Sequence, residues 1–113
     1  MHELWLCKSI LEIIKQYAMK KNCTQVKKVV LEIGLLAAVE KESLIFSFNV
    51  IAEGTVAENA ELHIIDIPGE ARCESCQKTV PLRQYYDECQ VCGSHSLTVT
   101  QGEELRVKSM VVE

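Results

Sequence analysis

The sequence predicts a small α/β (α+β) domain with two helices and a three-stranded sheet, interrupted near its C-terminal end by a cysteine-rich insert. Apolar residues recur at helical spacing in the first part of the chain, and three short segments have strand patterns. Two Cys-x-x-Cys pairs lie between the last two of these segments. The 113 residues are enough for one domain with a small insert.

The first helix is predicted over residues 4–20. Its apolar positions recur three and four residues apart: Leu4, Cys7, Leu11, Ile14 and Ala18. Cys7 lies on this stripe and is expected to be a core thiol. Cys23 follows the helix and is expected to have no role in a site.

Two further elements follow, a strand over residues 26–33 and a second helix over residues 41–53. Residues 41–53 also fit a strand by the alternation of Phe46, Phe48 and Val50. The helix is favoured by the length of the segment and by Glu40 at its start, where the helix dipole favours an acid. Gly54 follows as a helix end.

The remaining strands are predicted over residues 61–67 and 105–112, with Pro68 and Gly69 ending the first of them. A strand–helix–strand unit implies a right-handed crossover between parallel strands, and the last strand must then join the same sheet. The predicted domains are therefore residues 1–69 with 103–113, and an insert over residues 70–102.

Composition and charge narrow the class of protein. The formal net charge of −4 argues against nucleic acid or an anionic membrane as a partner. The N-terminus lacks the pattern of a targeting segment, and no apolar stretch approaches the roughly 18 residues of a membrane span. The cytosol is the expected location. Thiols stay reduced there, so paired cysteines are interpreted first as metal ligands.

The cysteine pairs are Cys73 with Cys76 and Cys89 with Cys92, separated by twelve residues that are enough for a strand out and a strand back. A two-residue turn brings two thiolates to one ion, and four thiolates close a tetrahedral shell. Such a shell is typical of structural zinc with no open position for chemistry. Iron in the same shell, or two disulfides in an oxidised sample, are the alternatives.

The charge of the insert disfavours nucleic-acid binding. Between Glu70 and Gly102 its charged residues give a net charge of −1: Arg72, Lys78, Arg83, Glu70, Glu74, Asp87 and Glu88. Tyr85 and Tyr86 therefore lack a surrounding basic field. We expect these two tyrosines to pack the ribbon.

Two histidines are weaker candidates for a site. His63 alternates with Leu62 and Ile64 on a predicted strand, so its side chain is expected to face solvent or an interface. His95 lies three residues past Cys92 and can substitute as a metal ligand, but four cysteines already fill the shell.

The chain begins Met1-His2-Glu3. The α-amine, the next backbone nitrogen and the imidazole of His2 can wrap one metal in fused chelate rings, and the backbone nitrogen of Glu3 can complete a plane. All-nitrogen planar shells suit Ni(II) and Cu(II) rather than zinc. The simpler interpretation, that His2 is a polar residue ahead of a helix, is favoured from this chemistry alone.

Five segments together resemble the hydrogenase maturation nickel metallochaperone family, HypA/HybF. They are MHEL, VVLEIGLLAAVE, EGTVAENAELHI, the two Cys-x-x-Cys pairs and LRVKSMVVE, which cover nearly the whole chain. The resemblance implies an α/β nickel-binding domain and a zinc ribbon inserted before the last strand. It implies nickel at Met1, His2 and Glu3, and it matches Glu40 to an acidic residue often linked to that site.

The resemblance also implies a function. Members of the family deliver nickel to the large subunit of [NiFe]-hydrogenase together with a nickel-inserting GTPase, and the chain is expected to be a monomer or homodimer without enzymatic activity. Trp5 departs from the family pattern, in which a small polar residue is expected. It either shields the nickel site or marks a contact surface. The alternatives are a zinc-ribbon adaptor that binds protein or RNA without nickel, and an enzyme that uses the α-amine or an open metal site.

Overall fold

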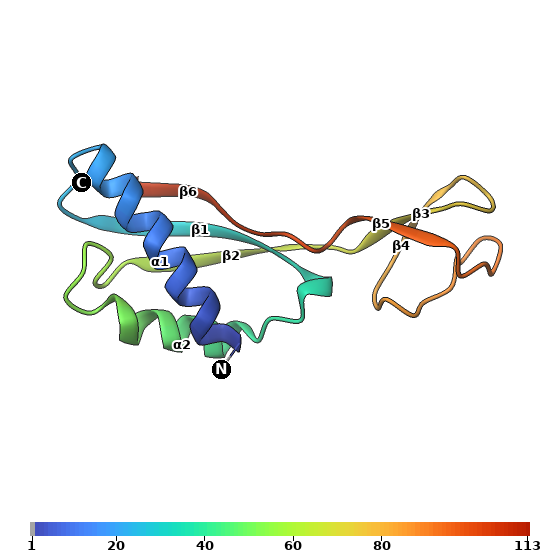
Figure 1. Cartoon of the computed structure of the whole chain (residues 1–113), viewed down its shortest axis with the longest axis horizontal. Coiled ribbons are helices and arrows are strands. Elements are labelled where there is room, and N and C mark those ends of the chain that lie inside the picture. Colours follow the sequence, from blue (N-terminus) through green and yellow to red (C-terminus); the bar gives the residue numbers. More distant parts are fainter. Residues whose placement is uncertain (1) are drawn as a thin grey trace. The chain divides into compact units, whose positions relative to one another are not determined.

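The computed structural model describes residues 2–113, and the side chains of residues 3–113 (Figure 1). The chain divides into two compact units, each with its own secondary structure. Unit 1 comprises Met1–Leu31, Val39–Ile65 and Arg106–Glu113, and unit 2 comprises Glu32–Ala38 and Asp66–Leu105. The predicted insert, residues 70–102, lies within unit 2.

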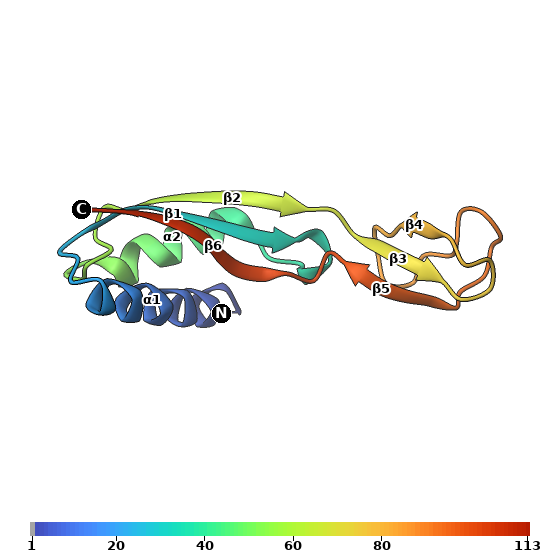
Figure 2. The ribbon, with the colours of Figure 1, turned by 90° about the horizontal axis from the view of Figure 1, so that it is seen from above.

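Unit 1 is a two-layer arrangement of helices on a sheet. Its helices are α1 (His2–Lys20) and α2 (Lys41–Ala52), and its sheet has the order β2–β1–β6, with β1 (Val26–Gly34), β2 (Glu61–Ile67) and β6 (Leu105–Val112). Both helices cover the same face of this sheet (Figure 2). The predicted α/β class, and the joining of the last strand to the first sheet, are therefore confirmed.

Helix α1 follows the predicted apolar stripe and begins two residues earlier than expected. Cys7, Ile10, Leu11, Ile14 and Ala18 are all buried. The helix ends where Asn22 adopts a left-handed conformation with φ of 55°. There the N–H of Cys23 donates to the carbonyl of Ala18 at 2.9 Å and that of Asn22 to Met19 at 3.3 Å, which satisfies the last free carbonyls.

The ambiguous segment after Glu40 is the helix α2. Leu44, Phe48 and Ala52 recur every four residues and are buried, whereas Phe46 and Val50, the positions that favoured a strand, are exposed. The Glu40 carboxylate accepts a hydrogen bond from the N–H of Glu42 at 3.1 Å and so caps the helix. Neither helix of residues 2–113 has the length and apolar composition for a membrane crossing.

Strand β1 is the central strand of unit 1, and it is buried on the face covered by the helices. Val29 and Leu31 are fully buried there. The arrowheads of β1 and β2 lie at the same end of the sheet, as a crossover through α2 requires (Figure 2). Strand β6 runs the other way, since hydrogen bonds join Gly34 to Glu104 and Glu113 to Gln25.

Unit 2 contains a small antiparallel sheet of order β4–β3–β5. Its strands are β3 (Glu70–Cys73), β4 (Thr79–Pro81) and β5 (Leu97–Gln101), with Ala71 opposite both Val80 and Val99. The twelve residues between the cysteine pairs are enough for two strands, but β4 is the one strand there and β5 follows the second pair. The tight turn of residues 83–87 takes the place of the returning strand.

The core of unit 2 receives a residue from outside the predicted insert. Leu36, in the short 3-10 helix η1 (Leu35–Ala37), is 7% exposed and packs with Ala71 and Leu82. The prediction that Tyr85 and Tyr86 pack the ribbon is wrong, since these side chains are 58% and 75% exposed. The core around Ala71 is made of Leu36 and Leu82, with Leu97 and Val99 packed against it.

Gly34 and Gly102 allow two segments of unit 2 to approach without side chains between them. A Cβ atom on Gly34 would lie 1.9 Å from the carbonyl oxygen of Gly102. No other residue can therefore stand at position 34 unless the backbone moves. Gly102 itself has φ of 114°, a conformation that L side chains rarely adopt. The N–H of Leu36 donates to the Gly102 carbonyl at 2.9 Å, so this close approach holds η1 against the ribbon.

The predicted core thiol Cys7 is confirmed, and its burial gives a testable consequence. Its Sγ donates to the carbonyl of Leu44 at 3.1 Å. Burial, assisted by the negative charge of Glu3, raises the pKa of the Cys7 thiol from 9.0 to about 11. A raised pKa means that the folded chain holds this proton more tightly. The stabilisation is therefore complete below pH 9 and is lost as the pH rises through about 11.

At about pH 8, where a free thiol reacts readily, we expect iodoacetamide to alkylate Cys23 while Cys7 stays unmodified in the folded protein. Mass spectrometry of peptides after brief alkylation measures both sites. In denaturant the two thiols should react at similar rates, which is the internal control. Equal labelling of the folded chain contradicts the burial of Cys7.

Candidate metal centres

The four predicted zinc ligands converge on one point in unit 2. The Sγ atoms of Cys73, Cys76, Cys89 and Cys92 all lie within 4.8 Å of one another. The Cys73–Cys92 pair is separated by 3.5 Å and the Cys76–Cys89 pair by 3.8 Å. Four sulfurs around a zinc ion at about 2.3 Å lie about 3.8 Å apart in a tetrahedron, so the spacing fits that ion.

The two cysteine turns have the same local geometry. In the first, the N–H of Gln77 donates to the carbonyl of Cys73 at 2.8 Å, and Gln77 has φ of 67°. In the second, the N–H of Gly93 donates to Cys89 at 2.8 Å, and Gly93 has φ of 78°. Each pair is thus followed, one residue later, by a left-handed residue that closes a tight loop around its sulfurs.

Backbone N–H groups point at the sulfurs and stabilise their charged form. The N–H of Cys76 lies 3.5 Å from the Cys73 sulfur, and that of Val91 lies 3.4 Å from the Cys89 sulfur. The hydrogen bond from the Cys76 backbone is the main cause that lowers the pKa of the Cys73 thiol to about 6. A backbone hydrogen bond from Cys92 similarly lowers the pKa of Cys89. Backbone hydrogen bonds act on Cys76 and Cys92 in the same direction, but burial and the neighbouring sulfurs outweigh them and raise the pKa of both thiols. Two of the four thiols therefore ionise easily, and a bound cation favours ionisation of the other two.

His95 does not join this cluster. Its imidazole is exposed, and Nε2 lies 3.9 Å from the carboxylate of Glu88. Among the described side chains, those of residues 3–113, the one group of three or more with metal-ligand spacing is the set of four cysteines. The shell is closed by sulfur alone, and it leaves no position for a substrate.

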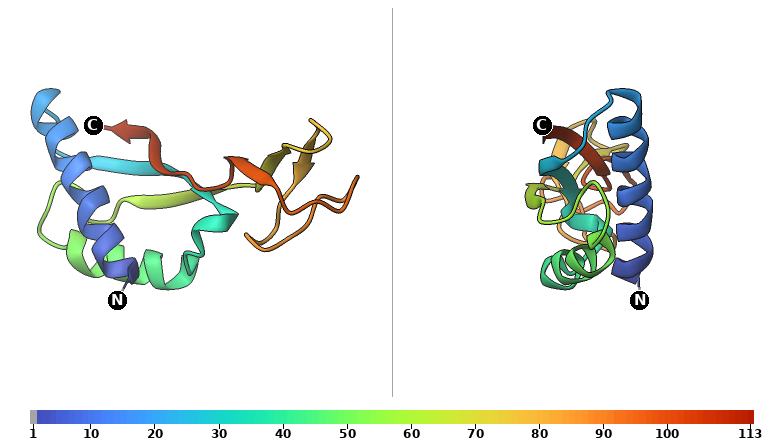
Figure 3. Two further views of the ribbon diagram at one scale, coloured as in Figure 1. Left: turned by 45° about the vertical axis from the view of Figure 1, so that its right-hand side comes forward. Right: turned by 90° about the vertical axis from the view of Figure 1, so that its left-hand side faces the viewer.

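The predicted nickel site lies where α1 begins. Met1 and the side chain of His2 are outside the described residues. Glu3 is in the first turn of α1, and its Oε2 accepts a long hydrogen bond, 3.4 Å, from the backbone N–H of Glu40. The start of α1 therefore lies beside the start of α2, as both views of Figure 3 show. Glu3 and Glu40, which are distant in sequence, are brought together.

Two other residues singled out from the sequence lie on the surface. Trp5 follows Glu3 on α1, and 69% of its surface is exposed, so its indole makes no contribution to the core. His63 faces solvent on β2, as predicted, and its Nε2 lies 3.1 Å from the carboxylate of its neighbour Glu61.

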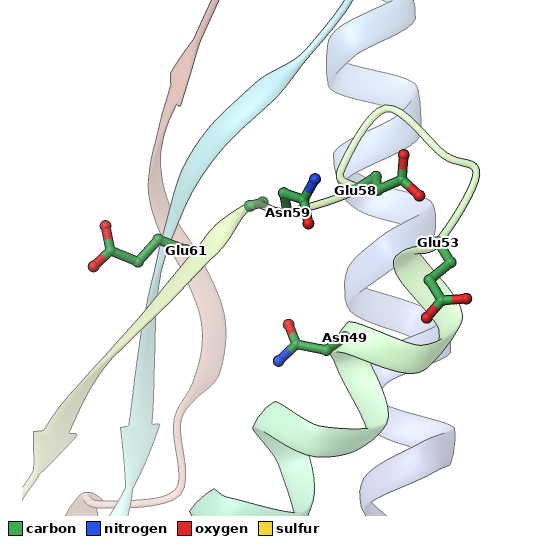
Figure 4. A pocket seen from close by; sticks show the side chains of 6 residues that line it. Asn49, Glu53, Glu58, Asn59 and Glu61 are labelled. Atoms are coloured by element: carbon green, nitrogen blue, oxygen red, sulfur yellow. The ribbon is translucent and has the colours of Figure 1, made fainter.

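A polar hollow in unit 1 also carries carboxylates, but it does not have the arrangement of a metal site. It has a volume of about 550 Å³ and is lined mainly by Asn49, Glu53, Glu58, Asn59 and Glu61. The carboxylates of Glu53, Glu58 and Glu61 do not converge (Figure 4). Glu58 accepts the N–H of Gly54 at 3.1 Å, and Glu61 pairs with His63.

Comparisons with known proteins agree on one family. The family described as "Hydrogenase/urease nickel incorporation, metallochaperone, hypA" matches residues 1–112. The chain is 69% identical over 113 residues to the hydrogenase maturation factor HypA of Legionella pneumophila (strain Lens), and 46% identical to that of Azotobacter vinelandii. Each of these alignments covers the whole of both chains.

Solved structures have the same fold. A solution structure of a HypA protein superimposes with a TM-score of 0.75 at 29% identity, covering 100% of this chain and 97% of that one. The solution structure of the Ni metallochaperone HypA from Helicobacter pylori gives 0.71 at 27% identity, covering 97% and 96%. By sequence over its full length and by fold, the chain belongs to the HypA family of nickel metallochaperones for hydrogenase maturation.

Proposed function

We propose that this chain binds Ni(II) through Met1, His2 and Glu3 and delivers it to the large subunit of a [NiFe]-hydrogenase. The observation that carries the proposal is the start of α1 at His2, beside the carboxylates of Glu3 and Glu40. A nickel-inserting GTPase is the proposed co-worker, and the cytosol is the proposed place, since the thiols of unit 2 must stay reduced.

The first turn of a helix offers backbone nitrogens that no carbonyl of the helix occupies. The amides of His2 and Glu3 are in this position, next to the α-amine. An amine, two deprotonated amides and an imidazole form the nitrogen plane that Ni(II) prefers. The same turn carries the positive end of the helix dipole, which opposes a cation. The nearby carboxylates of Glu3 and Glu40 offset that opposition.

Such a site can bind nickel and also release it. Each nitrogen must lose a proton before it coordinates, so protons compete with the metal and affinity falls with falling pH. Most of the proposed ligands are backbone nitrogens at the start of α1, not side chains of a closed cluster. A partner protein can therefore approach the metal and replace one nitrogen after another with its own ligands, which is what delivery requires.

We propose a structural role for zinc at Cys73, Cys76, Cys89 and Cys92. The support is the tetrahedral spacing of the sulfurs and the backbone N–H groups that point at them. An adaptor without nickel is the alternative function, and the exposed Tyr85 and Tyr86 of unit 2 are in its favour. Nickel stoichiometry separates the two proposals, because the adaptor needs zinc alone.

Changing Cys73 to Ser should remove zinc and unfold unit 2, because metal binding and folding are one process in small metal modules. Metal analysis and amide NMR spectra of the zinc-loaded protein measure both effects. Cys23→Ser is the matched control, since Cys23 is outside the cluster and should leave one zinc per chain. Zinc retained at full stoichiometry in Cys73→Ser, with an unchanged spectrum, contradicts the proposed shell.

Changing His2 to Ala should raise the nickel dissociation constant by about 100-fold or more, since loss of even a partner of a ligand typically changes metal affinity by about 10- to 100-fold. Zinc content and circular dichroism should not change. Nickel titration by calorimetry makes the measurement. His63→Ala, an exposed histidine in unit 1, is the control. Equal nickel affinity in both variants places the metal elsewhere.

Extending the chain by a few residues ahead of Met1 tests the amine itself. Every side chain survives, and only the α-amine becomes a peptide nitrogen, which is a far poorer ligand. We expect nickel affinity to fall by about 100-fold and to return once the extension is cleaved off. A site made of side chains alone, such as His2 with Glu40, predicts no change. Equal titrations before and after cleavage reject coordination by the amine.

A further inference from the structure

Unit 2 carries an open groove that neither metal site uses. Its volume is about 360 Å³, and it lies between residues 35–38 and residues 83–86. We call it the tyrosine groove, and its lining residues are Leu35, Leu36, Ala38, Arg83, Gln84, Tyr85 and Tyr86. All of them belong to unit 2, so the shape of the groove is set within that unit.

The groove gathers most of the exposed apolar surface of unit 2. Four large apolar side chains of the unit are exposed, and three of them line the groove: Leu35 at 55%, Tyr85 at 58% and Tyr86 at 75%. Val91 is the fourth. Exposed aromatic residues that gather around a hollow are typical of protein interaction sites, where tyrosine supplies contact area at a low cost in side-chain entropy.

Hydrogen bonds hold both walls in place before any partner arrives. The Asp87 carboxylate accepts the N–H groups of Arg83 and Gln84 at 3.0 and 3.2 Å, which fixes the turn. The hydroxyl of Tyr85 donates to Glu103 at 2.6 Å, which fixes the direction of the ring. The opposite wall is anchored by the buried Leu36. A fixed groove loses little conformational freedom on binding.

The charge of unit 2 determines which partner fits. The unit contains eight carboxylates and three cations, a formal net charge of −5 with histidine neutral. Two of these carboxylates, Asp87 and Glu103, contact groove residues directly. Arg83 is the single cation of the lining. A basic partner is therefore attracted from a distance and finds carboxylates at the rim.

We infer that the tyrosine groove docks a short segment of a partner protein in which apolar side chains are flanked by lysine or arginine. The apolar side chains lie against Leu35 and the tyrosine rings. One flanking cation lies beside Glu103, the carboxylate that accepts the Tyr85 hydroxyl, and the face of the exposed Tyr86 ring attracts another. Arg83 opposes a basic residue at its own end, so it sets the direction of the segment.

Other occupants are disfavoured by the same charges. Nucleic acid also stacks on tyrosine, but it needs cations along its backbone, and the groove has one. A second copy of the chain carries the same acidic unit 2, so two grooves that face each other repel one another. The inference does not depend on nickel, because no residue of the groove lies in unit 1.

The test uses the full zinc-loaded chain, labelled with nitrogen-15, and synthetic peptides as probes. One peptide carries a Leu-Phe pair flanked by lysines, a second has glutamates in place of the lysines, and a third has alanines in place of the pair. The first should give saturable amide shifts at Leu35, Gln84 and Tyr86, with a dissociation constant below about 1 mM. The others should bind at least about threefold more weakly.

Three variants and one control identify the groove as the site. Tyr86→Ala and Glu103→Gln should each raise the dissociation constant of the lysine peptide by about threefold or more. The Arg83→Ala protein should bind the lysine peptide as tightly as the unchanged protein, or more tightly. If the groove instead takes an acidic segment, removal of Arg83 should weaken binding of that segment. Glu12→Gln removes a carboxylate from α1 and should change nothing. Zinc content and nickel affinity should be unchanged in all four, so failure here leaves the nickel proposal intact.

Any of three results overturns the inference: no saturable shift with the lysine peptide, equal binding of the glutamate peptide, or saturable shifts only with a short oligoribonucleotide. One further result also overturns the inference. If the sedimentation coefficient rises with protein concentration, and no longer does so in Tyr86→Ala, the groove binds a second copy of the chain.

Discussion

The convergence of four sulfur atoms is the constraint on which unit 2 depends. Its strands have four, three and five residues, and its apolar clusters consist of a few small or medium side chains. A core of this size cannot offset the entropy of ordering the segment. Four thiolates within 4.8 Å repel one another strongly unless a cation lies among them. The metal therefore both removes this repulsion and holds two otherwise weak turns together.

The sequence was sufficient for those features that depend on neighbours along the chain. Helix α1 was predicted from its stripe, and the cysteine turns from their spacing, because each is a local geometry. The segment of α2 was ambiguous by periodicity alone, and the structure resolves it through burial. Leu44 and Phe48 are fully buried, and Phe46 and Val50 are exposed. The length of the segment and the acid at its start were the correct guides.

Features that depend on distant contacts could not be predicted. Leu36 follows a strand and reads as a loop residue, yet it occupies the core of unit 2 because Gly34 and Gly102 permit a close backbone approach. Tyr85 and Tyr86, which were expected to pack the ribbon, are exposed instead. The proximity of Glu3 and Glu40 was expected only through family resemblance. It is a result of the packing of α1 on α2, and no local pattern encodes it.

The two proposed metal sites place opposite demands on the chain, and this gives a reason for their separation. A zinc shell of four thiolates is stable because it is closed, and a partner cannot enter it without unfolding the turns. A cargo site must be open to a partner and sensitive to protons. The nitrogens at the start of α1 meet that need, because a helix leaves them without acceptors. Sulfur ligands at the start of α1 would bind soft metals too tightly for exchange. Nitrogen ligands in the cysteine cluster would weaken the binding of the structural zinc. Residue chemistry thus keeps each ion at its own site.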